Sequence, residues 1–437
     1  MLTYYLKIAF AGFRRNMALS LLTVLTVAIG IGGAMSTFTI YHVMSGDPIP
    51  GKSGKLFVPQ FDSIGPQARE KTDEPPDLLS YRDVLALMRA PAGEQHAAMY
   101  PTRMTVTPPN PSLSQLAVSA RATQPAFFRM FDTPFQSGAP WSDAEEAARA
   151  RVVVLSARTA ERLFSNQDAV GKTVTLNGQD YRVAGVLKPW NPTPRFYDLS
   201  GDALAQSEGV YLPFATAIDR QMDSNGHTEC DVAPAPGAGW QGMLNSNCVW
   251  LQYWVQLPDA AAVTRYNAFL SQYATEQQRS GRFSWLPMTR LRDVRQWMRY
   301  KQVIPNELRV VVLLGFGFLL VCMVNAVGLM LARLNGRTAD LGVRRALGAT
   351  KGDILIQCVI EAAFVGLLGG LAGLSLTVAG AAAERAIVAQ SLARITHIDN
   401  MLVLITLTLA VASTICAGLY PAWRASRTPP AMQLRAR

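Results

Sequence analysis

The stretch VVVLLGFGFLLVCMVNAVGLMLA, residues 310–332, contains no charged residue, and residues 17–46, 362–383 and 401–423 share this property. Each of the four stretches is at least 22 residues long. An α-helix needs about 20 apolar residues to cross the hydrocarbon core of a bilayer. The sequence therefore predicts four transmembrane helices. The alternative, four buried helices of a large soluble protein, is disfavoured because soluble cores rarely repeat such long apolar runs.

The composition of the whole chain agrees with a membrane protein. Its 437 residues are 49% hydrophobic and 16% charged, against roughly 25% charged residues in soluble domains. This balance excludes a disordered chain, and five cysteines in such a length exclude a disulfide-rich mini-protein. The first apolar run follows basic residues, as a signal peptide would. It exceeds the 7–15 apolar residues typical of signal peptides, so we expect it to stay in the membrane.

The distribution of charge predicts the orientation of the chain. Residues 1–16, 333–353 and 424–437 together hold 12 basic and two acidic residues, and this excess equals the formal net charge of +10. The positive-inside rule places these segments, and hence both termini, in the cytoplasm. The remainder of the chain is neutral, which argues against nucleic-acid binding.

The predicted fold class is an α-helical membrane protein with four transmembrane helices and a large α+β periplasmic domain inserted between helices 1 and 2. In chain order we expect a cytoplasmic amphipathic helix (1–16), transmembrane helix 1 (17–46), the periplasmic domain (47–304), transmembrane helix 2 (305–334), a cytoplasmic coupling helix (335–353), transmembrane helix 3 (354–383), a periplasmic loop (384–400), transmembrane helix 4 (401–423) and a cytoplasmic tail (424–437).

The amphipathic pattern at the N-terminus comes from apolar residues at helical spacing, with Lys7 and Arg14 off their face. These apolar residues are Leu2, Tyr5, Leu6, Ala9, Phe10 and Phe13. A helix lying in the inner membrane interface fits this pattern, because its basic residues would meet anionic headgroups. A plain extension of the first span is the alternative.

Local patterns in the periplasmic domain predict both strands and helices. The predicted strands are 151–155, 173–176, 181–187 and 249–257, and the predicted helices are 157–164 and 260–279. Asn177-Gly178 is a strong hairpin signal between two of these strands. Proline-rich residues 101–111, 189–194 and 234–237 are predicted to be loops.

Two of the five cysteines, Cys230 and Cys248, fall in this domain. Because the periplasmic side is oxidising, we expect them to form a disulfide, which would stabilise the fold by about 3 kcal/mol. A metal site that adds His227 is disfavoured, since a structural zinc takes four ligands. We predict no metal and no cofactor.

Enzyme motifs are absent from the sequence. Gly171-Lys172-Thr173 resembles the end of a phosphate-binding loop, but Asn166 occupies the position of the required glycine. No His-Glu-x-x-His and no Gly-x-Ser-x-Gly motif occurs. The chain is therefore predicted not to be an enzyme.

The third span carries two overlapping small-residue motifs and one acid. Gly366 with Gly370, and Gly369 with Gly373, have the spacing that lets membrane helices approach closely. They could pack within the four-helix unit or against a second copy of the chain. For Glu361, near the start of this span, we expect the carboxylate to reach the inner interface.

The loop RLNGRTADLGVRRALGATKGD, residues 333–353, predicts a short capped helix. Thr338 is the expected cap, Asp340 lies in the first turn, and Arg344-Arg345 lie in the last turn, where they complement the helix dipole. Gly348 is placed to end the helix. Thr350 and Asp353 then suggest a capping box for the next helix. Such a helix offers a rigid surface to another protein, and a basic turn on lipid headgroups is the alternative.

Residues 337–349, RTADLGVRRALGA, resemble a motif of the MacB/FtsX-type ABC transporter permeases, also called type VII or mechanotransmission permeases. Asp340 stands where the family usually has Glu. Residues 418–434 resemble the C-terminal end of these proteins, and residues 151–187 resemble the core of their periplasmic domain. Residues 188–250 match no known part of the family.

The resemblance implies a permease of the bacterial inner membrane that works as a homodimer or with a related partner, with a cytoplasmic ABC ATPase bound to each copy. ATP hydrolysis would belong to that ATPase, and its motion would pass through spans 1 and 2 to the periplasmic domain. The residues implied in ATPase coupling are Arg337, Asp340, Leu341, Val343, Arg344, Arg345 and Leu347.

Export or efflux from the periplasmic side is the expected role, and a periplasmic adaptor stays open as a further partner. The alternatives are a regulator of a periplasmic partner such as a cell-wall hydrolase, and a lipoprotein-extracting permease. The large outer domain favours export over the regulator.

Overall fold

The computed structural model describes residues 2–65, 74–90, 95–108, 114–165, 167–387 and 400–427. The chain forms two compact units. The membrane unit comprises Met1–Gly46 and Ile304–Arg437, and the inserted domain comprises Asp47–Val303. Of the predicted segments, residues 388–399 of the loop and 428–437 of the tail lie outside the described residues.

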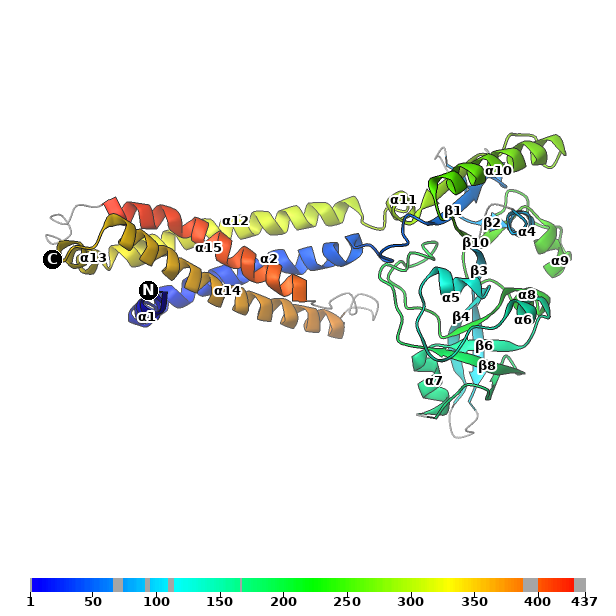
Figure 1. Cartoon of the computed structure of the whole chain (residues 1–437), viewed down its shortest axis with the longest axis horizontal. Coiled ribbons are helices and arrows are strands. Elements are labelled where there is room, and N and C mark those ends of the chain that lie inside the picture. The colour runs from blue at the N-terminus through cyan, green and yellow to red at the C-terminus, as the bar shows by residue number, and fades with distance from the viewer. Residues whose placement is uncertain are drawn as a thin grey trace. The chain divides into compact units, whose positions relative to one another are not determined.

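Four helices of the membrane unit are, among the described residues, long and apolar enough to span a membrane (Figure 1). They are α2 (Met17–Ser45), α12 (Asn306–Asn335), α14 (Lys351–Ile387) and α15 (Asn400–Arg427). Two shorter helices, α1 (Leu2–Arg15) and α13 (Thr338–Ala346), belong to the same unit. The predicted four-span architecture with an α+β insertion between the first two spans is confirmed.

The spanning helices pack around a common apolar core. Ile31 and Ala34 of α2 meet Cys322 and Ala326 of α12, and Ala410 of α15 joins the same cluster. A Cβ at Gly30 of α2 would lie 2.8 Å from the Cβ of Cys322, so the two helices approach closely at this glycine. Tight contact between α2 and α12 links the two spans that flank the inserted domain.

The inserted domain is built on one mixed sheet of eleven strands within the described residues. The strands are β1 (Leu56–Phe61), β2 (Leu79–Ser80), β3 (Gln95–Thr107), β4 (Leu116–Thr123), β5 (Phe135–Gly138), β6 (Val152–Leu155), β7 (Thr173–Leu176), β8 (Gln179–Leu187), β9 (Val210–Pro213), β10 (Val249–Gln256) and β11 (Thr289–Asp293). Their order is β11-β1-β10-β3-β4-β9-β6-β8-β5, with β2 beside β10, and β7 beside both β3 and β8.

Short helices connect and cover these strands. They are α4 (Tyr81–Leu87), α5 (Ala126–Met130), α6 (Asp143–Ala147), α7 (Ala157–Phe164), α8 (Phe214–Asp219), α9 (Gly239–Asn245), α10 (Ala260–Arg279) and α11 (Val294–Tyr300). The longest, α10, buries Tyr266 and Leu270 completely. Its Tyr273 ring lies 5.1 Å from the Phe61 ring of β1, so α10 covers the β1 end of the sheet.

The locally patterned elements agree with the prediction. Strand β6, helices α7 and α10, and strand β10 fall within one or two residues of the predicted bounds. Strands β7 and β8 pair antiparallel across Asn177-Gly178. Both turn residues have positive φ, 48° and 74°, as a tight hairpin turn of this type requires.

The predicted loop at 101–111 is wrong in its first part, because β3 continues through Pro101 to Thr107. Pro101 pairs with Arg121 of β4. On its other edge, β3 pairs with β10 only as far as Met99, and it pairs with β7 only from Val106 onward. The missing N–H of proline therefore falls where no ladder bond needs it.

Candidate functional site

A short helix, α13, joins α12 to α14 through two tight turns. It ends at Ala346, and Gly348 follows with a φ of +103°, a conformation that favours glycine. At the start of α14 the Asp353 amide donates to Thr350 Oγ1 at 3.2 Å, and the Thr350 amide donates to Asp353 Oδ2 at 2.9 Å. This reciprocal pair is the predicted capping box.

The N-terminal cap of α13 differs from the prediction. Its capping position is Arg337, which makes no side-chain cap. Thr338 is the first helical residue, and its hydroxyl donates to the Asn335 carbonyl at 3.1 Å. Asp340 in the first turn, and Arg344 with Arg345 in the last, lie as predicted along the helix dipole.

The inner face of α13 packs on the spanning helices. Leu341 is 5% exposed and contacts a cluster that contains Ile354 and Cys358 of α14 and Ala422 of α15. Leu341 was expected to take part in ATPase coupling by direct contact. Its burial shows instead that it anchors α13 to the membrane unit, because apolar side chains at helical spacing serve the inner face as well as the outer one.

Two arginines of the coupling motif also point inward, toward α14. Arg337 Nη1 donates to Glu361 Oε2 at 2.9 Å, and Arg333 at the end of α12 lies 3.6 Å from the same oxygen. Gln357 Nε2 donates to the other oxygen of Glu361 at 3.1 Å. Arg344 Nη1 donates to Gln357 Oε1 at 3.0 Å. One carboxylate thus joins α12, α13 and α14.

The Glu361 carboxylate is held inside the helix group rather than at its surface, and its position at the inner interface stays a prediction. The side chain of Glu361 is 8% exposed, and those of Arg333 and Arg337 are 8% and 11% exposed. A buried carboxylate is retained where cations neutralise it, and two are present here. The sequence signal for this arrangement is the spacing of Arg333 and Arg337, one helical turn apart.

Helix α1 packs beside this group. A Cβ at Gly12 would lie 2.9 Å from the Arg337 guanidinium, and Arg15 forms an ion pair with Asp340. The Phe13 and Phe364 rings are 6.3 Å apart, edge to face. Part of the predicted apolar face of α1 is therefore used for contact with α14, whereas Phe10 of that face is 52% exposed.

The outer face of α13 is apolar and uncovered in this chain. Val343 is 48% exposed and Leu347 is 83% exposed, and Ala346 lies exposed between them. Arg345 borders this face and is half-buried. Of the expected coupling residues, Val343 and Leu347 are therefore the apolar ones available to a partner.

The four motif glycines of α14 face two different neighbouring helices. A Cβ at Gly366 would lie 2.0 Å from Thr414 Oγ1, and one at Gly370 would lie 2.8 Å from the Ala410 Cβ, both in α15. On the other side, a Cβ at Gly369 would lie 2.5 Å from Val27, and one at Gly373 would lie 3.0 Å from the Ala28 carbonyl, both in α2. Of the two hypotheses, these contacts favour packing within the four-helix unit.

Two family models match this chain. A model of the MacB-like periplasmic core domain matches residues 20–273, more than half of the chain. A model of the FtsX-like permease C-terminal region matches residues 312–430. The chain belongs to the MacB/FtsX-type ABC transporter permeases.

Relatives of this permease include the macrolide export ATP-binding/permease protein MacB of Salmonella typhi, which is 26% identical over 395 residues. MacB of Escherichia coli strain K12 is 25% identical over 392 residues. Each match covers 85% of this chain and 52% of the relative. The permease therefore spans about half the length of the curated relatives it matches.

Solved structures of similar domains are more distant. The periplasmic region of MacB from Actinobacillus actinomycetemcomitans is 15% identical, with a TM-score of 0.37, over 59% of this chain and 95% of that one. The extracellular domain of the ABC-type transporter YknZ from Gram-positive bacteria is 16% identical, with a TM-score of 0.34, over 54% of this chain and 99% of that one.

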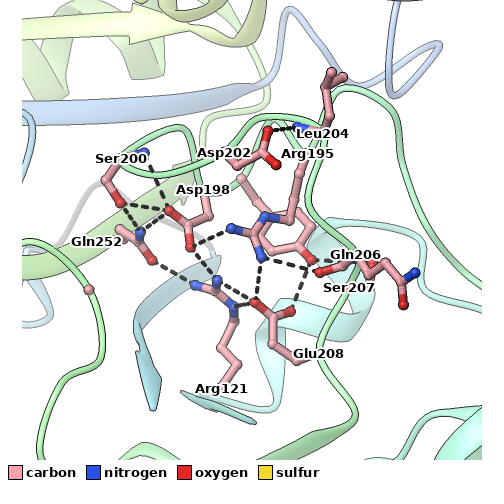
Figure 2. Close-up of polar contacts among 12 residues, drawn as sticks. Arg121, Arg195, Asp198, Ser200, Asp202, Leu204, Gln206, Ser207, Glu208 and Gln252 are labelled. Atoms are coloured by element: carbon pink, nitrogen blue, oxygen red, sulfur yellow. Dashed lines mark hydrogen bonds and ion pairs between the residues drawn. The ribbon is translucent and has the colours of Figure 1, made fainter. Parts of the chain in front are cut away.

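The inserted domain of the permease contains a second buried polar cluster, which the sequence did not predict. Figure 2 shows Arg121 of β4 facing Asp198 and Glu208, both from the connection between β8 and β9. Its Nε donates to Glu208 Oε1 at 2.9 Å, Nη2 donates to Asp198, and Nη1 donates to Gln252 Oε1 of β10 at 2.6 Å. Arg195 lies 3.2 Å from Glu208 and 3.4 Å from Asp198.

This cluster balances two cations with two acids in a fully buried place. Burial alone would raise the pKa of Asp198, but the guanidinium groups of Arg121 and Arg195 lower that pKa to about 2. Since every charge has an opposite partner, the arrangement fastens the 195–208 segment to the sheet. The available sequence signal was a single charged residue, Arg121, in the otherwise uncharged strand Leu116–Thr123.

The two cysteines of the inserted domain are joined. The structure contains a Cys230–Cys248 disulfide with a Cα–Cα distance of 4.2 Å. Glu229 and Val249, next to the two cysteines, form an isolated β-bridge. Within the described residues no group of three or more His, Cys, Asp or Glu side chains is arranged to hold a metal ion near His227 or elsewhere.

Proposed function

We propose that this chain is the permease subunit of an ATP-driven transporter, and that a separate cytoplasmic ATPase subunit binds the outer face of α13. The observation that carries the proposal is the division of this helix. Its inner face is anchored by Leu341 and by the Arg337–Glu361 pair, whereas Val343 and Leu347 are exposed on the outer face. A rigid apolar surface bordered by a basic residue suits a helix-in-groove contact.

The proposed mechanism passes motion from α13 to the spans. Because α13 is connected to α12 and α14 by short turns, displacement of α13 would shift both helices. Helix α12 packs closely on α2 at Gly30, so the first span would follow. These two spans flank the inserted domain in sequence, which supports transmission of ATPase motion to that domain.

The proposed setting is the bacterial inner membrane, with both termini in the cytoplasm and the inserted domain in the periplasm. A second permease chain would complete the assembly. Export or efflux from the periplasmic side is the proposed activity, and the macrolide export named in the relatives supports it.

Substitution of the outer face tests the docking. In the Val343→Asp, Leu347→Asp double variant, recovery of an ATP-binding subunit with the tagged permease should fall about tenfold or more, because an unpaired carboxylate in an apolar contact costs several kcal/mol. The subunit is identified and quantified by mass spectrometry of the purified complex. Leu341 and Arg344 are unsuitable targets, since both contact α14.

Leu286→Asp is the matched control, because Leu286 is an exposed leucine of the inserted domain, 58% accessible. It should leave recovery of the ATP-binding subunit unchanged. Equal recovery with the α13 double variant and with the unmodified permease, at equal membrane insertion, would remove α13 as the docking element.

A further inference from the structure

We propose that Glu361 is the positioning residue of the coupling region: it locks α13 to α12 and α14, so that the three helices move as one body. This inference rests on the proposed docking of an ATPase at α13. Glu361 is not part of the outer face formed by Val343 and Leu347, so its role would be to keep α13 from moving independently of the spans.

The first support is the number of elements that meet at one carboxylate. Glu361 belongs to α14, Arg333 to the last turn of α12, and Arg337 to the N-terminal cap of α13. Both cations approach the same oxygen of Glu361, at 3.6 and 2.9 Å. The Arg337 contact is a charge-assisted hydrogen bond, which is stronger than a neutral one, and Arg333 adds an ion pair. The carboxylate therefore fixes the α12–α13 turn to the N-terminal third of α14.

The second support is that both ends of α13 depend on the same residue. Gln357, one helical turn before Glu361 on α14, donates to its free oxygen and accepts from Arg344 in the last turn of α13. Arg337 holds the first turn and Arg344 holds the last. A helix held at both ends cannot tilt on the span without breaking one of these bonds.

The third support is the exclusion of solvent. Gly12 of α1 lies against the Arg337 guanidinium, since a Cβ at this position would be 2.9 Å from Arg337 Nη1. Glu361, Arg333 and Arg337 are all at most 11% exposed at their side chains. Electrostatic attraction is much stronger in such a place than at a wet surface, so neutralising Glu361 leaves two buried cations without their acid.

Hydrogen exchange of the purified full-length permease in nanodiscs tests the lock without any ATPase. In Glu361→Gln, exchange of amides in residues 337–347 should accelerate about tenfold or more, because breaking a buried ion pair loosens the elements it joins. Arg337→Gln should give a similar increase. The double variant should add little to either, since the two changes remove the same interaction.

Glu307→Gln is the matched control, an identical change at an exposed glutamate in the first turn of α12. It should leave exchange of residues 337–347 unchanged. If Glu361→Gln also leaves it unchanged, or if the two single variants add independently, the lock is overturned whatever the ATPase does.

The functional arm separates positioning from general stability. Glu361→Gln keeps the outer face of α13, so an ATP-binding subunit should still co-purify at the unmodified level. The unmodified permease should change the rate of ATP hydrolysis per bound subunit relative to the subunit alone. With Glu361→Gln, this change should be lost. An unchanged rate per bound subunit would overturn the positioning role. Failure of the unmodified chain to bind any ATPase would instead refute the proposed function, and the exchange result would still decide the lock.

Discussion

At the scale of single residues, Arg121 shows how the inserted domain tolerates a charge in its sheet. The side chain is fully buried, and an unpaired cation there would be very unfavourable. Each of its donors meets an acceptor from the 198–208 segment or from β10. The segment belongs to residues 188–250, which were expected to match no part of the family. The model of the MacB-like periplasmic core domain spans residues 20–273 and therefore includes them. The cluster fixes this segment on the sheet.

Replacing Arg121 should leave the buried carboxylates of Asp198 and Glu208 without their main cationic partner. Arg121→Met is expected to lower the free energy of unfolding of the inserted domain by about 3–5 kcal/mol, the usual effect of removing one partner from a buried ion pair. The measurement is denaturant unfolding of the detergent-solubilised chain followed by tryptophan fluorescence. Arg162→Met, an exposed arginine of α7, is the control and should have little effect. A loss as small as that of the control would contradict the clamp.

Acidity should weaken the same cluster in a defined direction. The pKa of Asp198 is lowered from 3.8 to about 2 in the folded chain. Its contribution to stability is therefore complete above the unfolded value and is lost as pH falls toward about 2. The difference in unfolding free energy between the unmodified chain and Asp198→Asn should shrink between about pH 5 and pH 2. A constant difference across this interval would refute the assignment.

At the scale of elements, α14 is the central helix of the membrane unit because it has two close-packing faces. Gly366 and Gly370 admit α15, and Gly369 and Gly373 admit α2. Membrane helices lack a strong hydrophobic driving force between them, so close approach at small residues supplies much of their association.

A side chain at Gly366 should separate α14 from α15. Gly366→Val is expected to destabilise the solubilised chain by about 1–3 kcal/mol, since Thr414 already occupies the space. Gly380→Val on the same helix is the control, because a Cβ there meets nothing within 4 Å. Thermal unfolding monitored by size-exclusion chromatography compares the two. Equal unfolding temperatures would show that the glycine face is not packed in this way.

How much of this was predictable depends on the range of the interactions. The spans, α7, α10 and the β7–β8 hairpin come from patterns within a few residues, and the sequence predicted them. The continuation of β3 through Pro101 depends on which distant strands pair with it at that point. The Arg121 cluster joins residues more than 70 positions apart in the chain. Likewise, the motif predicted a helix at 338–346, but only its packing shows that Leu341 is inside and Leu347 outside.

At the scale of the whole molecule, the number of spans that precede a segment decides on which side of the membrane it lies. The inserted domain follows one span, and α13 follows two. The domain and α13 must therefore lie on opposite sides of the membrane if all the spanning helices cross it. The basic residues predict that α13 is on the cytoplasmic side.

Single cysteines test this sidedness. With Cys322, Cys358 and Cys416 replaced by serine, Leu286→Cys should react with a membrane-impermeant maleimide in intact cells, whereas Lys351→Cys should react only after permeabilisation. Both positions are exposed, and Lys351 lies outside the proposed docking face, so access to the side chain is not limiting. The opposite labelling pattern would invert the topology and place α13 out of reach of a cytoplasmic ATPase.

The order of the sheet also has a consequence for biogenesis. Strand β1 opens the inserted domain, yet its partners are β10 and β11, which close it. A chain growing from its N-terminus must hold β1 as an unpaired edge until almost the entire domain has been made. Such late pairing slows folding and invites association with other chains. A nascent chain arrested before Asp293 would thus lack part of the ladder of β1 and expose that edge to other chains, so quality control of this protein should recognise incomplete inserted domains.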